Sequence, residues 1–124
     1  MAKPIPVDNE REERITMEII VDANGPEEQA MGWYCYLEGE LRTPFSARCS
    51  RERSMSPLKI GQKVKVLGMA DESECEREMF VTIRWKKERL AVPLAQLDPM
   101  GEVDESTWQA IEDWHYWVGR GYEF

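Results

Sequence analysis

Residues 80–94, FVTIRWKKERLAVPL, decide the fold class of this chain. A run rich in β-branched and aromatic residues, Phe80–Trp85, and an apolar run, Leu90–Leu94, flank the polar segment Lys86–Arg89. This pattern predicts a β-hairpin with a four-residue loop. Because Pro93 has no backbone N–H, the second strand either ends there or lies at the edge of a sheet. The chain therefore contains antiparallel strands.

Shorter strands are predicted before this hairpin. Residues Phe45–Cys49 alternate in polarity, and so do Lys63–Leu67, which follow a turn signal at Ile60 and Gly61. Together these segments predict a small curled antiparallel sheet of four or five strands. An SH3-like partial barrel would fit strands of this length.

Helical patterns lie on both sides of the predicted strands. Residues 26–41 form the clearest one, because Pro26 suits a first helical turn and apolar residues recur at helical spacing, namely Ala30, Trp33, Tyr34, Leu37 and Leu41. Residues 12–23 predict an earlier helix. The β-branched run from Ile19 to Val21 keeps a strand open as the alternative there.

A third helix is predicted near the C-terminus. Ser106 and Gln109 fit a capping box, and one face carries Trp108, Ile111, Trp114 and Val118. Tyr116 and Trp117 lie off that face, so we expect them to be partly exposed. The predicted fold is α+β: two N-terminal helices, the sheet, and a C-terminal helix. We expect one domain over residues 1–124, with a loose N-terminal arm over about residues 1–10.

Composition excludes several kinds of function. The chain has 124 residues and a net charge of −8, which disfavours binding to nucleic acid or to an anionic membrane and favours cations or basic partners. Three cysteines without CxxC spacing indicate reduced thiols in the cytosol, and a single histidine, His115, excludes the common zinc motifs. No secretory signal or long apolar run is visible. We therefore expect a cytoplasmic monomer.

The run DESECERE at residues 71–78 is the strongest candidate for a binding site. It carries five carboxylates and one guanidinium, and it forms a long loop between two predicted strands. Such a run can be a solvated connector, or it can supply oxygen ligands to calcium. Two more acids, Glu38 and Glu40, lie at the end of the second helix, where the helix dipole disfavours anions. The candidate ligands are Glu38, Glu40, Asp71, Glu72, Glu74, Glu76 and Glu78.

Other site motifs find little support. The segment around Asp22 and Gly25 lacks the ligand spacing of an EF-hand, so a calcium site would have to combine separate segments. No motif positions a nucleophile or a phosphate, and His115 fits packing in an amphipathic helix better than catalysis. A basic stretch includes Arg48, Arg51, Arg53, Lys59, Lys63 and Lys65, which indicates solvated faces or, as a minor alternative, a surface for an acidic partner.

Three longer segments, 13–23, 25–34 and 111–118, resemble the calcium-binding protein family first known from cyanobacteria, CcbP. The middle of the chain continues the likeness at residues 74–76, 79–81, 83–85 and 90–94. The resemblance implies a compact α+β protein that binds calcium in the cytosol without EF-hands, in a family linked to calcium buffering during cell differentiation. It also implies an important acid directly after Leu37 and Glu38, where this chain has Gly39.

Two functions from different classes follow. The first is a non-enzymatic calcium-binding protein, a cytosolic buffer or sensor that uses the surface carboxylates named above. The alternative is an SH3-like interaction module whose acidic face docks a basic protein and binds cations only nonspecifically. Selectivity for calcium over magnesium distinguishes them, because charge screening does not discriminate between these ions.

Overall fold

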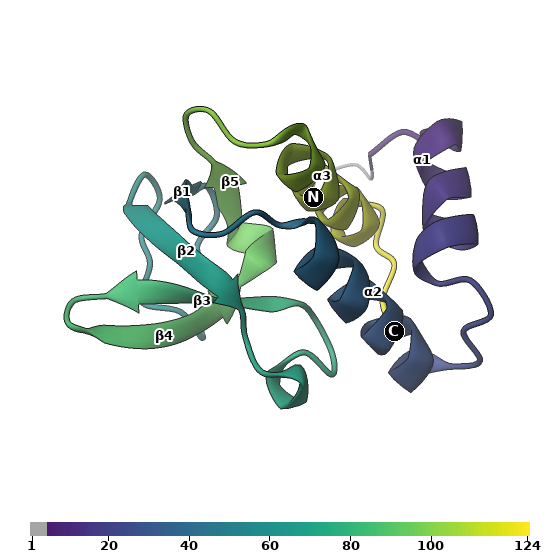
Figure 1. Ribbon diagram of the computed structural model, residues 1–124, viewed down its shortest axis with the longest axis horizontal. Helices are drawn as coiled ribbons and strands as arrows, with labels where there is room; N and C mark the ends of the chain where they lie inside the picture. Colours follow the sequence, from purple (N-terminus) through teal and green to yellow (C-terminus); the bar gives the residue numbers. More distant parts are fainter. Residues whose placement is uncertain (1–4) are drawn as a thin grey trace.

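The computed structural model describes residues 5–124 and confirms the α+β fold. Three helices lie at one end of the molecule and the antiparallel sheet at the other (Figure 1). In chain order the elements are α1 (Asn9–Arg14), the π-helical turn η1 (Ile15–Ile19), α2 (Pro26–Glu40), β1 (Phe45–Cys49), β2 (Lys63–Met69), the 3-10 turn η2 (Glu72–Glu74), β3 (Phe80–Trp85), β4 (Glu88–Pro93), the 3-10 turn η3 (Leu94–Gln96), β5 (Leu97–Pro99) and α3 (Glu105–Gly119).

The sheet has five strands in the order β4-β3-β2-β1-β5. Strands β1 to β4 form a meander, and β5 returns to pair with β1 on its free side. Strand β1 alternates between buried and exposed residues, as expected for a strand with one face on the core. The short β5 escaped the sequence pattern because it has only three residues, including a proline. The SH3-like comparison fits this strand order and stays a prediction.

The hairpin between β3 and β4 is tighter than its sequence suggested. Trp85 pairs with Glu88, so the loop contains two residues, Lys86 and Lys87, rather than the predicted four. Lys86 adopts a left-handed conformation with φ of 56°, which two-residue hairpin turns require. This turn could not be recognised from the sequence, because glycine or asparagine is the usual sign of such a turn and neither is present in the loop.

The N-terminal helical region begins earlier and ends earlier than predicted. Asp8 caps α1 by accepting a hydrogen bond from the Arg11 backbone N–H at 3.1 Å, and helical structure ends at Ile19. The strand alternative for residues 19–21 is wrong. The π-helical turn buries Ile15 and Ile19 against α2, where any side chain at Gly32 would collide with the Ile19 carbonyl. Tertiary packing thus overrides the β-branched preference.

Only part of the predicted N-terminal arm lies within the described residues. Residues 5–8 lie against the C-terminal part of α3. The Ile5 carbonyl accepts a hydrogen bond from Arg120, and the Asp8 backbone N–H donates one to the Tyr116 hydroxyl. From Asn9 onward the chain is helical. Residues 1–4 of the arm lie outside the described part of the chain.

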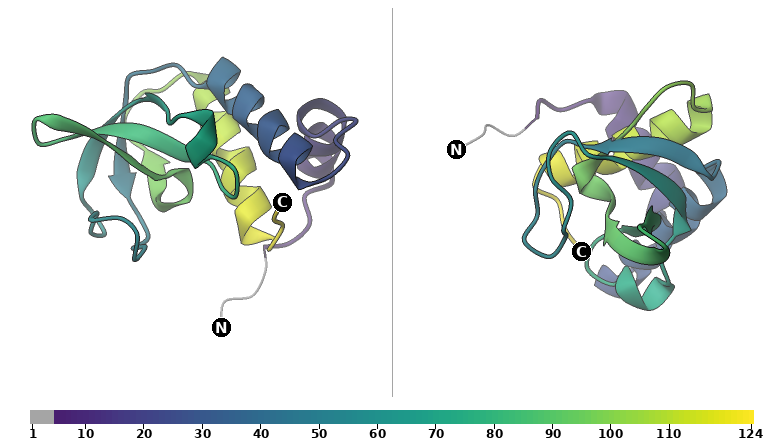
Figure 2. Two further views of the ribbon diagram at one scale, coloured as in Figure 1. Left: turned by 90° about the horizontal axis from the view of Figure 1, so that it is seen from below. Right: turned by 90° about the vertical axis from the view of Figure 1, so that its left-hand side faces the viewer.

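Helix α3 lies at the centre of the core and is covered on two sides (Figure 2). Trp33 of α2 packs edge-on against Trp114 of α3 with ring centroids 5.0 Å apart. Tyr116 and Trp117 are buried, which corrects the expectation that they are partly exposed, while Trp108 is 45% exposed although it was assigned to the core face. A single-face pattern fails here because the N-terminal segment and the C-terminal residues cover a second side of α3.

The start of α3 caps the end of α2 instead of capping itself. The Ser106 hydroxyl donates to the Glu40 carbonyl at 3.1 Å, and the Arg42 N–H donates to the Thr107 hydroxyl at 2.7 Å. The predicted capping box of Ser106 and Gln109 is therefore wrong. Carbonyls at a helix end need partners, and these hydroxyls supply them across the two helices. No helix within residues 5–124 is long and apolar enough to cross a membrane.

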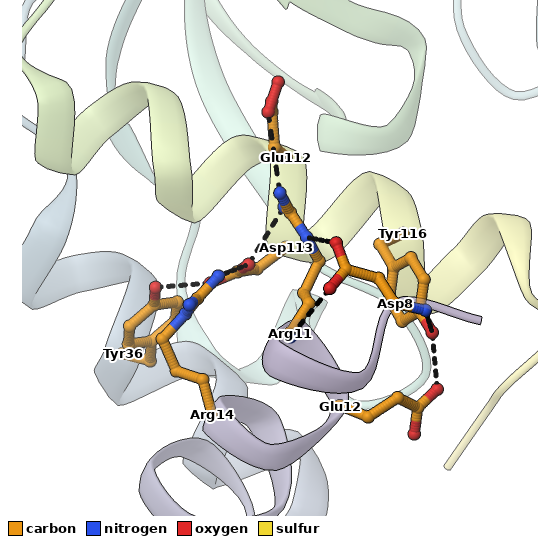
Figure 3. Close-up of polar contacts among 8 residues, drawn as sticks. All are labelled: Asp8, Arg11, Glu12, Arg14, Tyr36, Glu112, Asp113 and Tyr116. Carbon is orange, nitrogen blue, oxygen red and sulfur yellow. Dashed lines mark hydrogen bonds and ion pairs between the residues drawn. The ribbon is translucent and has the colours of Figure 1, made fainter. Parts of the chain in front are cut away.

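A buried carboxylate joins the three helices (Figure 3). Asp113 of α3 is completely buried and accepts four hydrogen bonds, one from Arg11, two from Arg14 and one from Tyr36, over 2.6–3.2 Å. The pKa of Arg14 is raised by its hydrogen bond to Asp113, and burial raises the pKa of Tyr36. A buried charge is tolerated when its partners satisfy it in this way.

We expect Asp113→Asn to destabilise the protein by about 3 kcal/mol, because two partly buried guanidinium groups lose their counter-charge. The matched control is Glu112→Gln, whose carboxylate lies 3.8 Å from Arg11 but is 43% exposed, and which we expect to change stability by less than about 0.5 kcal/mol. Urea unfolding of both variants measures the difference. Equal, small effects would show that the buried cluster does not hold α1 in place.

Candidate metal site

The acidic loop, residues 71–78, forms one wall of a cleft against α2. The cleft has a volume of about 580 Å³, and we call it the loop cleft. Its walls include four carboxylates and no basic residue; the lining residues are Glu27, Ala30, Met31, Tyr34, Asp71, Glu72, Ser73, Cys75 and Glu76. Three of the seven candidate ligands therefore border one cavity. The cleft combines segments that are far apart in the sequence.

The acidic loop is shaped by its own short-range contacts. Asp71 accepts hydrogen bonds from the backbone N–H and the hydroxyl of Ser73 at 3.1 and 3.3 Å, which starts the 3-10 turn η2. Cys75 is 2% exposed, and its sulfur accepts a hydrogen bond from the Phe80 N–H at 3.3 Å. Burial raises the pKa of this thiol. Cys75 thus holds the middle of the loop to the sheet as a neutral group.

Two further contacts fix the ends of the acidic loop. Tyr34 of α2 donates a hydrogen bond to the Ala70 carbonyl at 3.0 Å, directly before the loop. At the other end Glu78 forms a two-bond ion pair with Arg53, at 2.5 and 3.1 Å. Planar pairs of this kind are among the strongest in proteins. The Glu78 carboxylate is therefore already engaged, although the sequence suggested it as a ligand.

Tyr34 lies in a strongly negative environment. Burial, together with the nearby carboxylates of Glu38 and Glu72, raises the pKa of its hydroxyl to about 12. Glu38 at the end of α2 and Glu72 in the acidic loop thus both act on one phenol. The charge of Glu38 thus acts on a residue of the loop cleft, although the Glu38 side chain does not line the cleft. Tyr34 was assigned to the core by its helical spacing, and its hydroxyl gave no signal in the sequence.

The remaining candidate ligands lie outside the cleft lining. Glu74 is exposed in η2, and Glu40 is half-buried at the end of α2, where its backbone carbonyl accepts the Ser106 hydroxyl. Glu27, which was not among the candidate ligands, does line the cleft. Its position in the first turn of α2 was visible, but the approach of the acidic loop to that turn was not.

The donor chemistry of the loop cleft fits a hard cation. Carboxylate oxygens are among the ligands that calcium prefers, the lining supplies four carboxylates, and no lysine or arginine lines the cavity to compete. Within residues 5–124, however, no three acidic, histidine or cysteine side chains converge closely enough to hold an ion as they stand. Without an ion, the exposed carboxylates repel one another and stay apart. To coordinate an ion together, their side chains would have to turn into the cleft.

The single histidine, His115, is engaged by two neighbours. The His115 ring is held by the Leu97 carbonyl, 2.8 Å from Nε2, and by Asp98, 3.8 Å from Nδ1. Burial lowers the pKa of His115. This geometry is that of a packed histidine that links α3 to β5, in agreement with the sequence analysis.

The profile of the CcbP family, described as calcium binding, matches residues 13–118. The chain belongs to this family. It is similar to the crystal structure of Anabaena CcbP, with 39% identity, a TM-score of 0.85, and coverage of 97% of this chain and 98% of that one. A calcium-binding protein in its calcium-binding form is equally similar, with 39% identity, a TM-score of 0.84, and coverage of 94% and 95%. Among curated proteins, none matches the chain.

Membership in the CcbP family confirms the resemblance that the sequence segments carried. The likeness extends along almost all of both chains, so the helices, the sheet and the acidic loop all fall within it. Candidate ligands in this chain must still be argued from its own residues.

The environment of Tyr34 generates a spectroscopic prediction. Glu38 and Glu72 help to raise the pKa of its hydroxyl to about 12, so a cation held by these carboxylates should lower that pKa. Tyrosinate absorbance during alkaline titration, with and without calcium, measures the shift, and the Tyr34→Phe variant should lack it. An identical titration in calcium and in its absence would mean that no cation is bound near Tyr34.

Proposed function

We propose that this protein binds calcium without catalysing a reaction, as a cytosolic buffer or sensor. The observation that carries the proposal is the loop cleft, which four carboxylates and no basic residue line in a chain of the CcbP family. The similar protein in its calcium-binding form supports calcium as the ion. Because the acidic loop has anchors at both ends and in the middle, its acids start from a fixed path.

The proposed ligands are drawn from the two walls of the loop cleft. Asp71, Glu72 and Glu76 supply carboxylates from the acidic loop, Glu27 supplies one from α2, and Glu38 adds charge from the end of that helix. Glu40 and Glu74 are reserve ligands outside the lining, and Glu78 serves as the loop anchor through Arg53. Flexible carboxylates suit the six to eight ligands of calcium better than the tight octahedron of magnesium.

The alternative function is an SH3-like interaction module with an acidic docking face for a basic protein. The strand order, with β5 beside β1, fits an SH3-like sheet and therefore supports this alternative. In such a module, cations would only screen the negative charges, and screening acts on the whole acidic surface rather than on particular carboxylates. The two functions therefore differ in ion selectivity and in whether particular carboxylates matter.

We expect calcium to raise the melting temperature, because a ligand that binds only the folded state adds about 2.7 kcal/mol at one hundred times its dissociation constant. Magnesium at equal ionic strength should have a much smaller effect. Calorimetric melting in EDTA, calcium and magnesium measures both. Equal shifts in the two ions would support the interaction module instead.

Replacing the two cleft glutamates, Glu72→Gln with Glu76→Gln, should weaken calcium binding at least about tenfold, or about 1.4 kcal/mol. Their amides keep the size of the side chain but lose its charge. The matched control changes Glu10 and Glu13, two exposed acids of α1, and should alter the affinity less than about twofold. Titration calorimetry compares the variants. Equal losses would indicate a diffuse field and argue against a site in the cleft.

The family resemblance implies an acid at position 39, and the helix end can accommodate one. Gly39 lies in α2 with no atom within 4 Å of where its Cβ would be, and it is not among the residues with positive φ. Gly39→Asp should therefore tighten calcium binding while slightly lowering stability in EDTA, because anions at a helix C-terminus cost about 0.3–1 kcal/mol.

The control for this change is Gly39→Asn, which has the same size without the charge. Calorimetry should show tighter calcium binding for the aspartate variant than for the asparagine variant. If the two affinities are equal, the end of α2 contributes nothing to the site and the loop cleft binds calcium alone.

A further inference from the structure

The net charge of −8 conceals a strong separation of charge between the two ends of the molecule. The sheet and its connecting segments apart from the acidic loop, residues 45–70 and 79–99, contain ten basic and three acidic residues, a net charge of +7. The rest of the chain contains six basic and 21 acidic residues, a net charge of −15. Since the sheet and the helices occupy opposite ends of the long axis, this separation follows that axis (Figure 1).

Five of the basic residues share the solvent face of the sheet, and we call them the basic strip. All five are exposed, and they come from four neighbouring strands: Arg48, Lys63, Lys65, Arg84 and Arg89. The register sets like charges directly opposite each other, Arg48 against Lys63 and Arg84 against Arg89. Residues directly opposite lie on the same face, so the strip crosses the sheet from β1 to β4.

The basic strip is unfavourable for the fold by itself. Like charges directly opposite each other destabilise a sheet, and within residues 5–124 no carboxylate lies within 4.0 Å of these five cations. The nearest acids by register stand at its margins, with Asp98 of β5 opposite Arg48 and Glu88 at the hairpin turn. Asp98 lies 3.8 Å from the His115 ring instead. Within the described residues, none of the five cations is therefore held in an ion pair.

We propose that the basic strip is a docking surface for an acidic segment of a partner protein. Carboxylates laid across the four strands would pair with cations that have no carboxylate within 4.0 Å among residues 5–124, and the field of the sheet end would steer them there. The docking surface lies on the sheet, away from the α2 wall of the loop cleft, so the two sites use different residues.

Other polyanions fit this surface less well. Single-stranded nucleic acid is bound on exposed aromatic rings, and the described sheet carries none that is exposed, since Trp85 is half-buried beneath Lys86. A long nucleic acid would also extend beyond the sheet toward the helices and the acidic loop, which belong to the part of the chain with a net charge of −15, where like charges repel. A short acidic protein segment can remain on the strip.

The test uses a fluorescent peptide in which aspartate and glutamate alternate with serine, titrated with the full chain at low ionic strength. We expect binding that weakens as salt is added, and that falls at least about tenfold in the double variant Arg48→Gln with Lys63→Gln. This variant should melt at the same or a higher temperature, because it removes a like-charge pair. Fluorescence anisotropy and thermal melting measure both effects.

The matched control removes two exposed cations that do not belong to the strip, Lys59→Gln with Arg77→Gln, and should keep nearly full affinity for the peptide. No binding by the unchanged protein, or equal losses in the two double variants, would overturn the proposal. Strip-dependent binding of a DNA oligonucleotide tighter than that of the peptide would overturn it in favour of nucleic acid. Strip-dependent self-association in sedimentation would overturn it in favour of a second copy of this chain. Calcium affinity should be unchanged in the strip variant, so this test can fail while the proposed calcium function stands.

Discussion

The buried carboxylate of Asp113 is the constraint on which the arrangement of the helices depends. A charge without solvent is tolerable only if every lone pair finds a partner, and here the partners come from two other elements: Arg11 and Arg14 from α1, and Tyr36 from α2. The N-terminal helix must therefore dock where its guanidinium groups reach α3. Around this cluster the Trp33 and Trp114 rings pack together, which fixes how α2 lies against α3. The wall that α2 presents to the acidic loop depends on that position.

Local sequence patterns predicted a helix or strand correctly where a single local preference decides the structure. The strand Phe45–Cys49 alternates and Pro26 opens a helix, and the structure places both elements as expected. Patterns failed where two parts of the chain compete for one surface. Tyr116 and Trp117 looked exposed because a helix was assumed to have one buried face, whereas α3 has two. Ser106 looked like a cap for its own helix, yet its hydroxyl serves Glu40 of the preceding one.

The candidate site shows the same division. Charge patterning was enough to indicate the acidic loop, because five carboxylates in eight residues stand out in any sequence. It could not indicate that Glu27 faces the loop or that Glu78 is paired with Arg53, since both facts depend on how α2 and residues 50–62 fold against it. Net charge misled in another way, because a single total for the whole chain cannot report that its two ends have opposite signs.

The three anchors of the acidic loop have a consequence for how the protein can change over time. The path of the loop is set by the Ala70 carbonyl, the Cys75 sulfur and the Glu78 carboxylate, each held by a contact outside the run of acids. The side chains at positions 72, 74 and 76 are exposed and contribute nothing to that path. Substitutions at these positions therefore leave the contacts that hold the backbone intact. During evolution, the loop can acquire different sets of oxygen ligands while its backbone keeps the same path.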